Sequence, residues 1–78
     1  MAFTLRLNVK RFTRAVRLAG YHSDYALAVR MRINRATLKR VLDGDNNPGP
    51  AFIAGALRAL SPLRFEDLFD VGEAGGDV

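Results

Sequence analysis

The sequence has no cysteine and only one histidine in its 78 residues. The lack of cysteine excludes both a disulfide framework and a thiolate metal site. The single histidine, His22, is followed directly by Ser23 and Asp24, and residues so close in sequence cannot form a catalytic triad through that spacing. We therefore predict that the protein is not an enzyme, that it binds no metal, cofactor or small-molecule ligand, and that His22 lies in a loop.

The sequence also has no long apolar run. A membrane-spanning helix needs roughly 18 or more consecutive apolar residues, and no stretch approaches that length. Near the N-terminus, Arg6, Lys10 and Arg11 interrupt the apolar residues, so the core of a signal peptide is absent. These absences predict a cytoplasmic protein. The length and the 49% hydrophobic content fit one small globular domain.

Negative charge is scarce over most of the chain. Residues 1–64 contain all 12 Lys and Arg residues but only three of the eight acids, whereas residues 65–78 contain five acids and no cation. A block of excess positive charge attracts nucleic acid or an anionic membrane surface. A basic surface that is merely solvated has the same composition, so charge alone does not choose between these readings.

Apolar residues recur at helical spacing in five short stretches. Asn8, Ser23 and Asn34 each stand where a helix N-cap is needed, and Gly20 suits the left-handed conformation just past a helix end. The last stretch runs from residue 65 to residue 70, and its leading acids favour a helix N-terminus. The pattern predicts five short helices separated by turns.

The fold class predicted from this pattern is all-α, a compact bundle of four to five short helices with a helix-turn-helix. Phe3, Leu5 and Leu7 alternate with polar residues, so residues 3–7 form either a short strand or an extended N-terminal arm. Residues 1–71 are predicted to be a single domain, and the Gly-rich residues 72–78 a flexible C-terminal tail.

The third predicted helix carries cations on one side and apolar residues on the other. Val41 and Leu42 each lie within about 60 degrees of Leu38 around this helix, whereas Lys39 and Arg40 point away from Leu38. A helix held from behind by a partner helix, with Arg and Lys on its outer side, fits the major groove of duplex DNA.

Several short motifs of the sequence occur together, namely Ser23, Leu27-Ala28, Gly44, Asn47-Pro48 and the closing Phe65-Glu-Asp-Leu-Phe69. With these motifs, the chain resembles the lambda-repressor-like (Cro/repressor-type) helix-turn-helix family over about residues 9 to 69. The departures are Arg32 where the family usually has Gly in the turn, Asp24 where it commonly has a phosphate-binding Gln, and Leu42 in place of a frequent Glu.

The resemblance implies a Cro-like transcriptional repressor that inserts helix 34–42 in the major groove. The residues it places at base edges are Arg35, Ala36, Thr37, Lys39 and Arg40. The residues it places at phosphates are Ser23, Arg30, Arg32, Asn34, Asn46 and Asn47. The implied partners are double-stranded DNA and a second copy of the chain, at least on DNA, in a bacterial or phage-infected cell. Residues 3–7 and the last helix are the candidate surfaces for self-association.

Two other classes stay open from the sequence. One is a protein-interaction module, such as an antitoxin-like or repressor-antagonist domain, that uses Leu42, Phe52 or Phe69 as its surface. The other is a membrane-surface protein that uses the amphipathic first helix, although we predict no membrane partner. The tyrosines Tyr21 and Tyr25 are predicted to pack at the edge of the core rather than to stack on bases.

Overall fold

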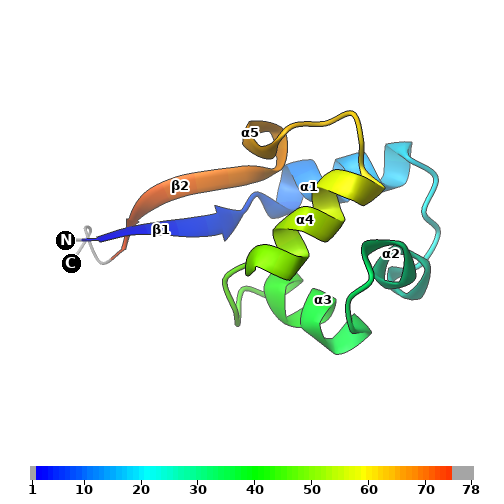
Figure 1. Cartoon of the computed structure of the whole chain (residues 1–78), viewed down its shortest axis with the longest axis horizontal. Coiled ribbons are helices and arrows are strands. Elements are labelled where there is room, and N and C mark those ends of the chain that lie inside the picture. The colour runs from blue at the N-terminus through cyan, green and yellow to red at the C-terminus, as the bar shows by residue number, and fades with distance from the viewer. Residues whose placement is uncertain (1, 75–78) are drawn as a thin grey trace.

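The structure, a computed structural model, describes residues 2–74. Its elements are β1 (Ala2–Leu7), α1 (Val9–Leu18), α2 (Asp24–Met31), α3 (Arg35–Leu42), α4 (Pro50–Ala59), α5 (Phe65–Leu68) and β2 (Phe69–Ala74). The two strands form an antiparallel ribbon that projects from one end of the helical body (Figure 1). The architecture is therefore α+β.

The prediction of an all-α fold is wrong because the two ends of the described chain pair with each other. Leu5 lies opposite Val71, and Leu7 lies opposite Phe69. The sequence pattern predicts residues 69 and 70 in the last helix, but α5 has a single turn and the backbone at Phe69 is already extended. The predicted strand at residues 3–7 is present, and it acquires a partner.

The prediction of a flexible tail at residues 72–78 is also wrong in part. Residues 72–74, assigned from their glycine content to a flexible tail, belong to β2. Residues 75–78, the rest of that predicted tail, lie outside the described residues. Glycine and acidic residues are poor strand formers, so the sequence pattern does not predict β2.

Three helices begin at a residue whose side-chain oxygen accepts a hydrogen bond from a backbone N–H group, as predicted. Asn8 Oδ1 accepts from Arg11 N–H at 3.0 Å, and Ser23 Oγ accepts from Ala26 N–H at 3.1 Å. Asn34 Oδ1 accepts from the N–H of Ala36 at 2.7 Å. These caps satisfy N–H groups that have no partner inside their own helices. They fix where α1, α2 and α3 begin.

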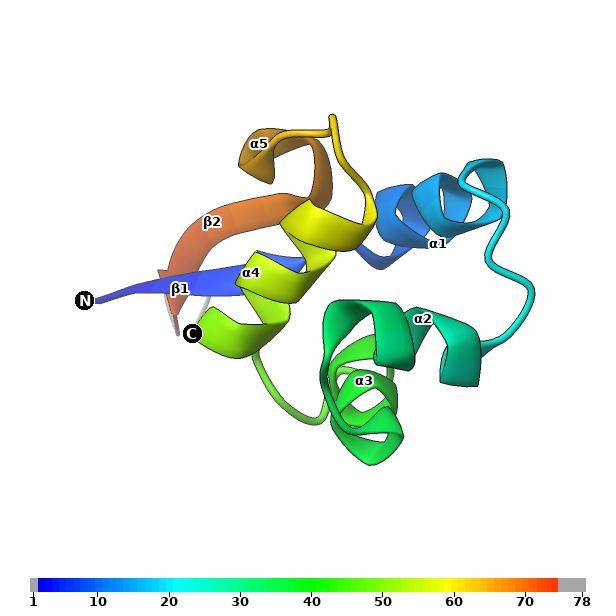
Figure 2. The same ribbon diagram turned by 45° about the vertical axis from the view of Figure 1, so that its right-hand side comes forward.

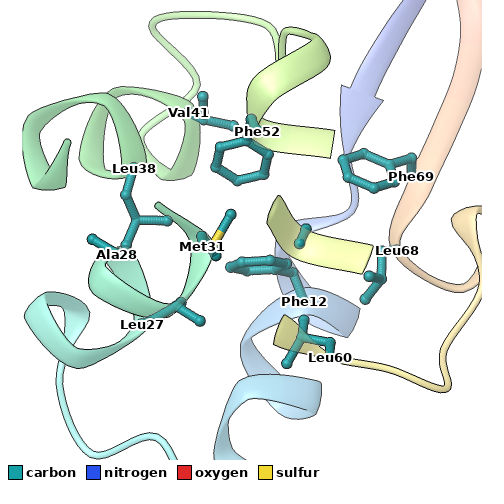
Figure 3. Close-up of a cluster of buried hydrophobic side chains, with 11 residues drawn as sticks. Phe12, Leu27, Ala28, Met31, Leu38, Val41, Phe52, Leu60, Leu68 and Phe69 are labelled. Carbon is teal, nitrogen blue, oxygen red and sulfur yellow. The ribbon is translucent and has the colours of Figure 1, made fainter. Parts of the chain in front are cut away.

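The core lies where the helices meet the start of β2 (Figure 3). The Phe12 and Phe52 rings lie 5.7 Å apart, and the Phe52 and Phe69 rings meet edge to face at 6.4 Å. The buried apolar residues are Phe12, Leu27, Ala28, Met31, Leu38, Val41, Phe52, Ala56, Leu60, Leu68 and Phe69. Burial of Phe69 explains why the chain turns from α5 into β2 at this residue: its ring fills the core.

A glycine allows α2 and α4 to approach closely. A Cβ atom added at Gly55 would lie 2.5 Å from the carbonyl oxygen of Met31. Only a residue without a side chain fits there. The contact holds the C-terminal end of α2 against α4, and it leaves α3 on the outside of the body (Figure 2).

Candidate nucleic-acid interface

Helices α2 and α3 form the predicted helix-turn-helix, with a turn at residues 32–34. Leu38 is fully buried and Val41 is nearly so, and both point into the core (Figure 3). The other side of α3 faces out. Its exposed residues are Arg35, Ala36, Lys39 and Arg40, whereas Thr37 is half-buried. The structure therefore brings the five residues assigned to base contacts onto one helix, four of them on its open face.

The turn between α2 and α3 contains a strained residue. Arg32 adopts a left-handed conformation, with φ 58° and ψ 42°. The N–H of Arg32 donates to the carbonyl of Val29, and the N–H of Ile33 donates to the carbonyl of Ala28, both at 3.1 Å. This pair of hydrogen bonds is a Schellman motif, which normally ends in glycine.

Two other helices end with the same motif, and each uses a glycine. Gly20 after α1 has φ 88°, and Gly44 after α3 has φ 84°. In each case the glycine N–H and the next N–H donate back to carbonyls of the last helical turn. The turn at Arg32 therefore has the same hydrogen-bond pattern as the two glycine turns, and an arginine in this left-handed conformation costs roughly 1 kcal/mol.

A shallow depression lies where the N-terminal ends of α2 and α3 meet. Its lining residues are Tyr25, Asn34, Arg35, Ala36 and Lys39. Tyr25 is 63% exposed, so the prediction that it packs at the core edge is wrong. The helical spacing already indicates that Tyr25 is exposed, because it lies about 160 degrees around the helix from the buried Leu27. Tyr21 matches its prediction: it is half-buried, and its hydroxyl donates to the carbonyl of Ala59 at 2.9 Å.

Among residues 2–74 there is one ion pair, and it lies on α3. Lys39 Nζ is 3.5 Å from Asp43 Oδ2, and both side chains are largely exposed. Such an exposed pair one helical turn apart contributes only about 0.3–0.5 kcal/mol. The Lys39 ammonium can therefore exchange its carboxylate for another anion at little cost.

Some residues assigned to phosphate contacts already have a partner in the protein. Ser23 and Asn34 accept hydrogen bonds as helix caps, although the Ser23 hydroxyl keeps its own hydrogen to donate. Asn47 Nδ2 donates to Thr4 Oγ1 at 3.0 Å, which links the loop after α3 to strand β1. Asn46 is exposed.

A second cationic surface lies beside the turn. Arg30, Arg32 and Arg58 line a depression between the end of α2 and α4. The rest of the lining is apolar and contains no acid, so three cationic residues border this depression without a carboxylate to neutralise them. Arg30 and Arg32 are among the residues predicted from the sequence, whereas Arg58 is not, because only the packing of α4 on α2 brings it to this site.

Two of the three residues suggested as the surface of a protein-interaction module are buried in this fold. Phe52 and Phe69 are buried, and Leu42 is half-buried. His22 is exposed in the connection between α1 and α2, as predicted. Over the described residues, no helix combines the length and apolar character that crossing a membrane requires.

Comparison with curated proteins finds a partial relative of this chain. Over 51 residues the chain is 41% identical to a Bacillus subtilis (strain 168) protein named "Uncharacterized HTH-type transcriptional regulator YvzC". The match covers 62% of this chain and 65% of that relative, slightly less than two thirds of its length. No protein-family model and no solved structure matches the chain. The relative's name supports a helix-turn-helix regulator and does not distinguish the Cro/repressor type.

Proposed function

We propose that this protein is a sequence-specific, double-stranded DNA-binding transcriptional regulator that places α3 in the major groove. The observation that carries the proposal is the two-sided character of α3. Leu38 and Val41 fix the helix to the core, while Arg35, Lys39 and Arg40 stand on its exposed side. A positively charged helix of this kind has the width and chemistry that the major groove accepts. The helix-turn-helix name of the relative supports the same reading.

Within α3, the side chains suit different contacts. The planar guanidinium groups of Arg35 and Arg40 match the two acceptors on the major-groove edge of guanine. Ala36 and the methyl group of Thr37 suit the thymine methyl, with Thr37 restricted by its partial burial. Lys39 reaches a base or a phosphate once its weak pair with Asp43 opens.

The DNA backbone is the proposed partner of a wider set of residues. They are Ser23, Arg30, Arg32, Asn34, Asn46 and Asn47, and the structure adds Arg58 as a neighbour of Arg30 and Arg32. If about six phosphates are neutralised, the logarithm of affinity should fall against the logarithm of salt concentration with a slope near −5.

The finer assignment follows the family resemblance. We propose a Cro-like repressor that acts in the cytoplasm of a bacterial or phage-infected cell. A single recognition helix contacts only a few base pairs, so such domains reach useful specificity as symmetric dimers on two half-sites. We therefore propose a homodimer, at least on DNA.

Selection from fragmented genomic DNA tests this function. The parent protein should enrich fragments that share a two-fold symmetric sequence. The variant Arg35→Ala/Arg40→Ala should then bind a selected duplex roughly 30-fold or more weakly, since each bidentate base contact is worth about 1–3 kcal/mol. It should also lose most of its preference over a random duplex.

A control variant separates base reading from simple charge. Arg17→Ala/Arg64→Ala removes two exposed arginines outside α2, α3 and α4. It should weaken binding to selected and random duplexes by the same small factor. The proposed function is wrong if the parent holds both duplexes equally weakly, or if the control loses as much preference as the α3 variant.

A further inference from the structure

A groove lies between helix α1 and the connection from α4 to α5. Its volume is about 480 Å³, and most of the residues that line it are apolar. Two of them are large apolar side chains that the fold leaves exposed: Leu18 is 77% and Leu63 is 38% exposed. An apolar depression bordered by charged side chains is typical of an interaction site on a soluble protein.

The groove is separate from the proposed DNA-binding surface. Figures 1 and 2 both place α5 and the connection leading to it on the opposite side of α4 from α3. None of the residues assigned to base or phosphate contacts lines the groove. A partner in the groove therefore leaves α3 free to bind DNA.

The two walls of the groove differ in charge. Arg11, Arg14 and Leu18 follow one another at helical spacing, so they lie on the same side of α1. Over residues 2–74, neither of these arginines has an ion-pair partner. On the opposite wall, Asp67 Oδ2 accepts a hydrogen bond from the Arg64 backbone N–H at 2.8 Å and so caps the start of α5. The charges without a partner are therefore positive, and they lie along α1.

We propose that this groove binds an amphipathic helix of a partner protein, with apolar side chains in the groove and Asp or Glu along the edge next to α1. Arg11 and Arg14 are about one helical turn apart, which places their Cβ atoms roughly 5–6 Å from each other. Acids three or four residues apart on a partner helix have the same spacing. A helix that lies along α1 can therefore pair with both arginines, and binding of a helix in an apolar groove is a common mode of recognition.

Neither a nucleic acid nor a membrane matches the groove as well. A phosphate backbone would pair with Arg11 and Arg14, but it has no apolar groups to cover Leu18 and Leu63. A membrane surface covers apolar side chains that project into it, and it does not enter a depression. The groove has roughly three times the ~150 Å³ that hold a benzene ring, which gives room for several apolar side chains of a peptide.

Binding of a designed peptide to the full chain tests the proposal. The probe is a fluorescent helical peptide of about 15 residues with a leucine stripe, Glu along one edge and Gln elsewhere. Fluorescence anisotropy should give a dissociation constant in the micromolar range for the parent protein. The same peptide with Lys in place of Glu should bind at least about 10-fold more weakly, because like charges then face each other.

Charge variants of α1 locate the ion pairs. Arg11→Gln/Arg14→Gln should weaken binding of the Glu peptide about 5-fold or more, because both pairs are lost. Lys10→Gln/Arg17→Gln is the matched control: it removes the same charge from the same helix, but neither residue lines the groove. It should change binding by less than about 2-fold. Arg11→Glu/Arg14→Glu should reverse the preference, so that the Lys peptide binds more tightly than the Glu peptide.

Leu18→Gln tests the apolar contact without a change of charge. It should also weaken binding of the Glu peptide about 5-fold or more. Val29→Gln is its control, because it changes an exposed apolar residue of α2 outside the groove, and it should have no effect. In the parent, the Glu peptide should shift the backbone amide resonances of residues 11–19 and 60–68 and leave those of α3 unchanged.

Helix α3 is the competing site for an acidic peptide, and the same measurements distinguish the two. Amide shifts that concentrate on α3, or a loss of peptide binding in Arg35→Ala/Arg40→Ala but not in Arg11→Gln/Arg14→Gln, overturn the groove proposal. Equal binding of the Glu and Lys peptides by the parent overturns it too. Binding of the parent to phosphatidylglycerol vesicles that is lost in Leu18→Gln would assign the groove to a membrane instead.

These outcomes are independent of the proposed function. The groove variants should keep the parent's preference for a selected duplex over a random one, because none of the residues they change lies on α3. A parent that binds the Glu peptide in the groove but shows no preference between duplexes overturns the proposed function and leaves the groove proposal standing.

Discussion

Replacing Arg32 with glycine should make the protein more stable and its binding to DNA weaker. Arg32 has φ 58°, a conformation in which the Cβ atom of an L-residue is crowded at a cost of roughly 1–2 kcal/mol. Gly20 and Gly44 occupy the same position of the same motif after α1 and α3 without that cost. The arginine side chain is exposed and has no ion-pair partner among residues 2–74, so its removal breaks no such contact.

The expected gain in the free energy of unfolding is smaller than the full energetic cost of the left-handed backbone at Arg32. Glycine gives the unfolded chain more conformational freedom, which offsets part of the relief. A net gain of about 0.5–1 kcal/mol in the free energy of unfolding should remain. For a domain of this size, 1 kcal/mol corresponds to roughly 4–8 °C in the melting temperature. Urea unfolding and thermal melts both resolve a change of this size.

Binding should change in the opposite direction. Arg32 lies with Arg30 and Arg58 around one depression, where a phosphate would be held by charge. Removal of one phosphate contact should reduce the steepness of the salt dependence by about 1, with little effect on the preference between sequences. Fluorescence anisotropy of a labelled duplex over a series of salt concentrations measures both quantities.

Arg32→Lys is the control for this experiment. It keeps the positive charge and the left-handed backbone, so neither the stability nor the salt slope should move by more than a small fraction of the glycine effect. A destabilised Arg32→Gly protein would refute the argument from backbone strain. An unchanged salt slope would instead remove Arg32 from the phosphate contacts while leaving the strain argument in place.

Two further predictions concern packing and the loop after α3. Gly55→Ala should destabilise the protein by about 1–3 kcal/mol in urea unfolding, because the new Cβ would meet the Met31 carbonyl oxygen at 2.5 Å; Gly72→Ala, with open space around it, should have little effect. Asn47→Ala and Thr4→Val both remove the hydrogen bond between loop and ribbon. If Asn47 also contacts a phosphate, only Asn47→Ala should weaken DNA binding; equal losses in the two variants would limit Asn47 to its link with Thr4.

The helix-turn-helix could be predicted from sequence because its signals are local. Ser23 and Asn34 cap α2 and α3 through hydrogen bonds that span no more than three residues. The apolar stripe of Leu38 and Val41 sets which side of α3 is buried, and it leaves the cations on the other side. These short-range features also determine which residues of α3 are exposed and are therefore proposed to contact DNA.

The features of the fold and of the candidate site that the sequence does not predict depend on contacts between residues far apart in the chain. Strand β2 exists because Phe69 enters the core and Val71 pairs with Leu5, more than sixty residues away. Arg58 reaches Arg30 and Arg32 only because Gly55 allows α4 to approach α2. Residues 69–74 include a glycine and two acids, and no local pattern in them predicts a strand.

The uneven charge along the sequence becomes an uneven charge in space. Helix α5 and strand β2 carry Glu66, Asp67, Asp70 and Glu73. Figures 1 and 2 both place α5 on the opposite side of α4 from α3. A molecule with this asymmetry turns its α3 side toward a polyanion during a diffusional encounter, since the field acts before contact is made.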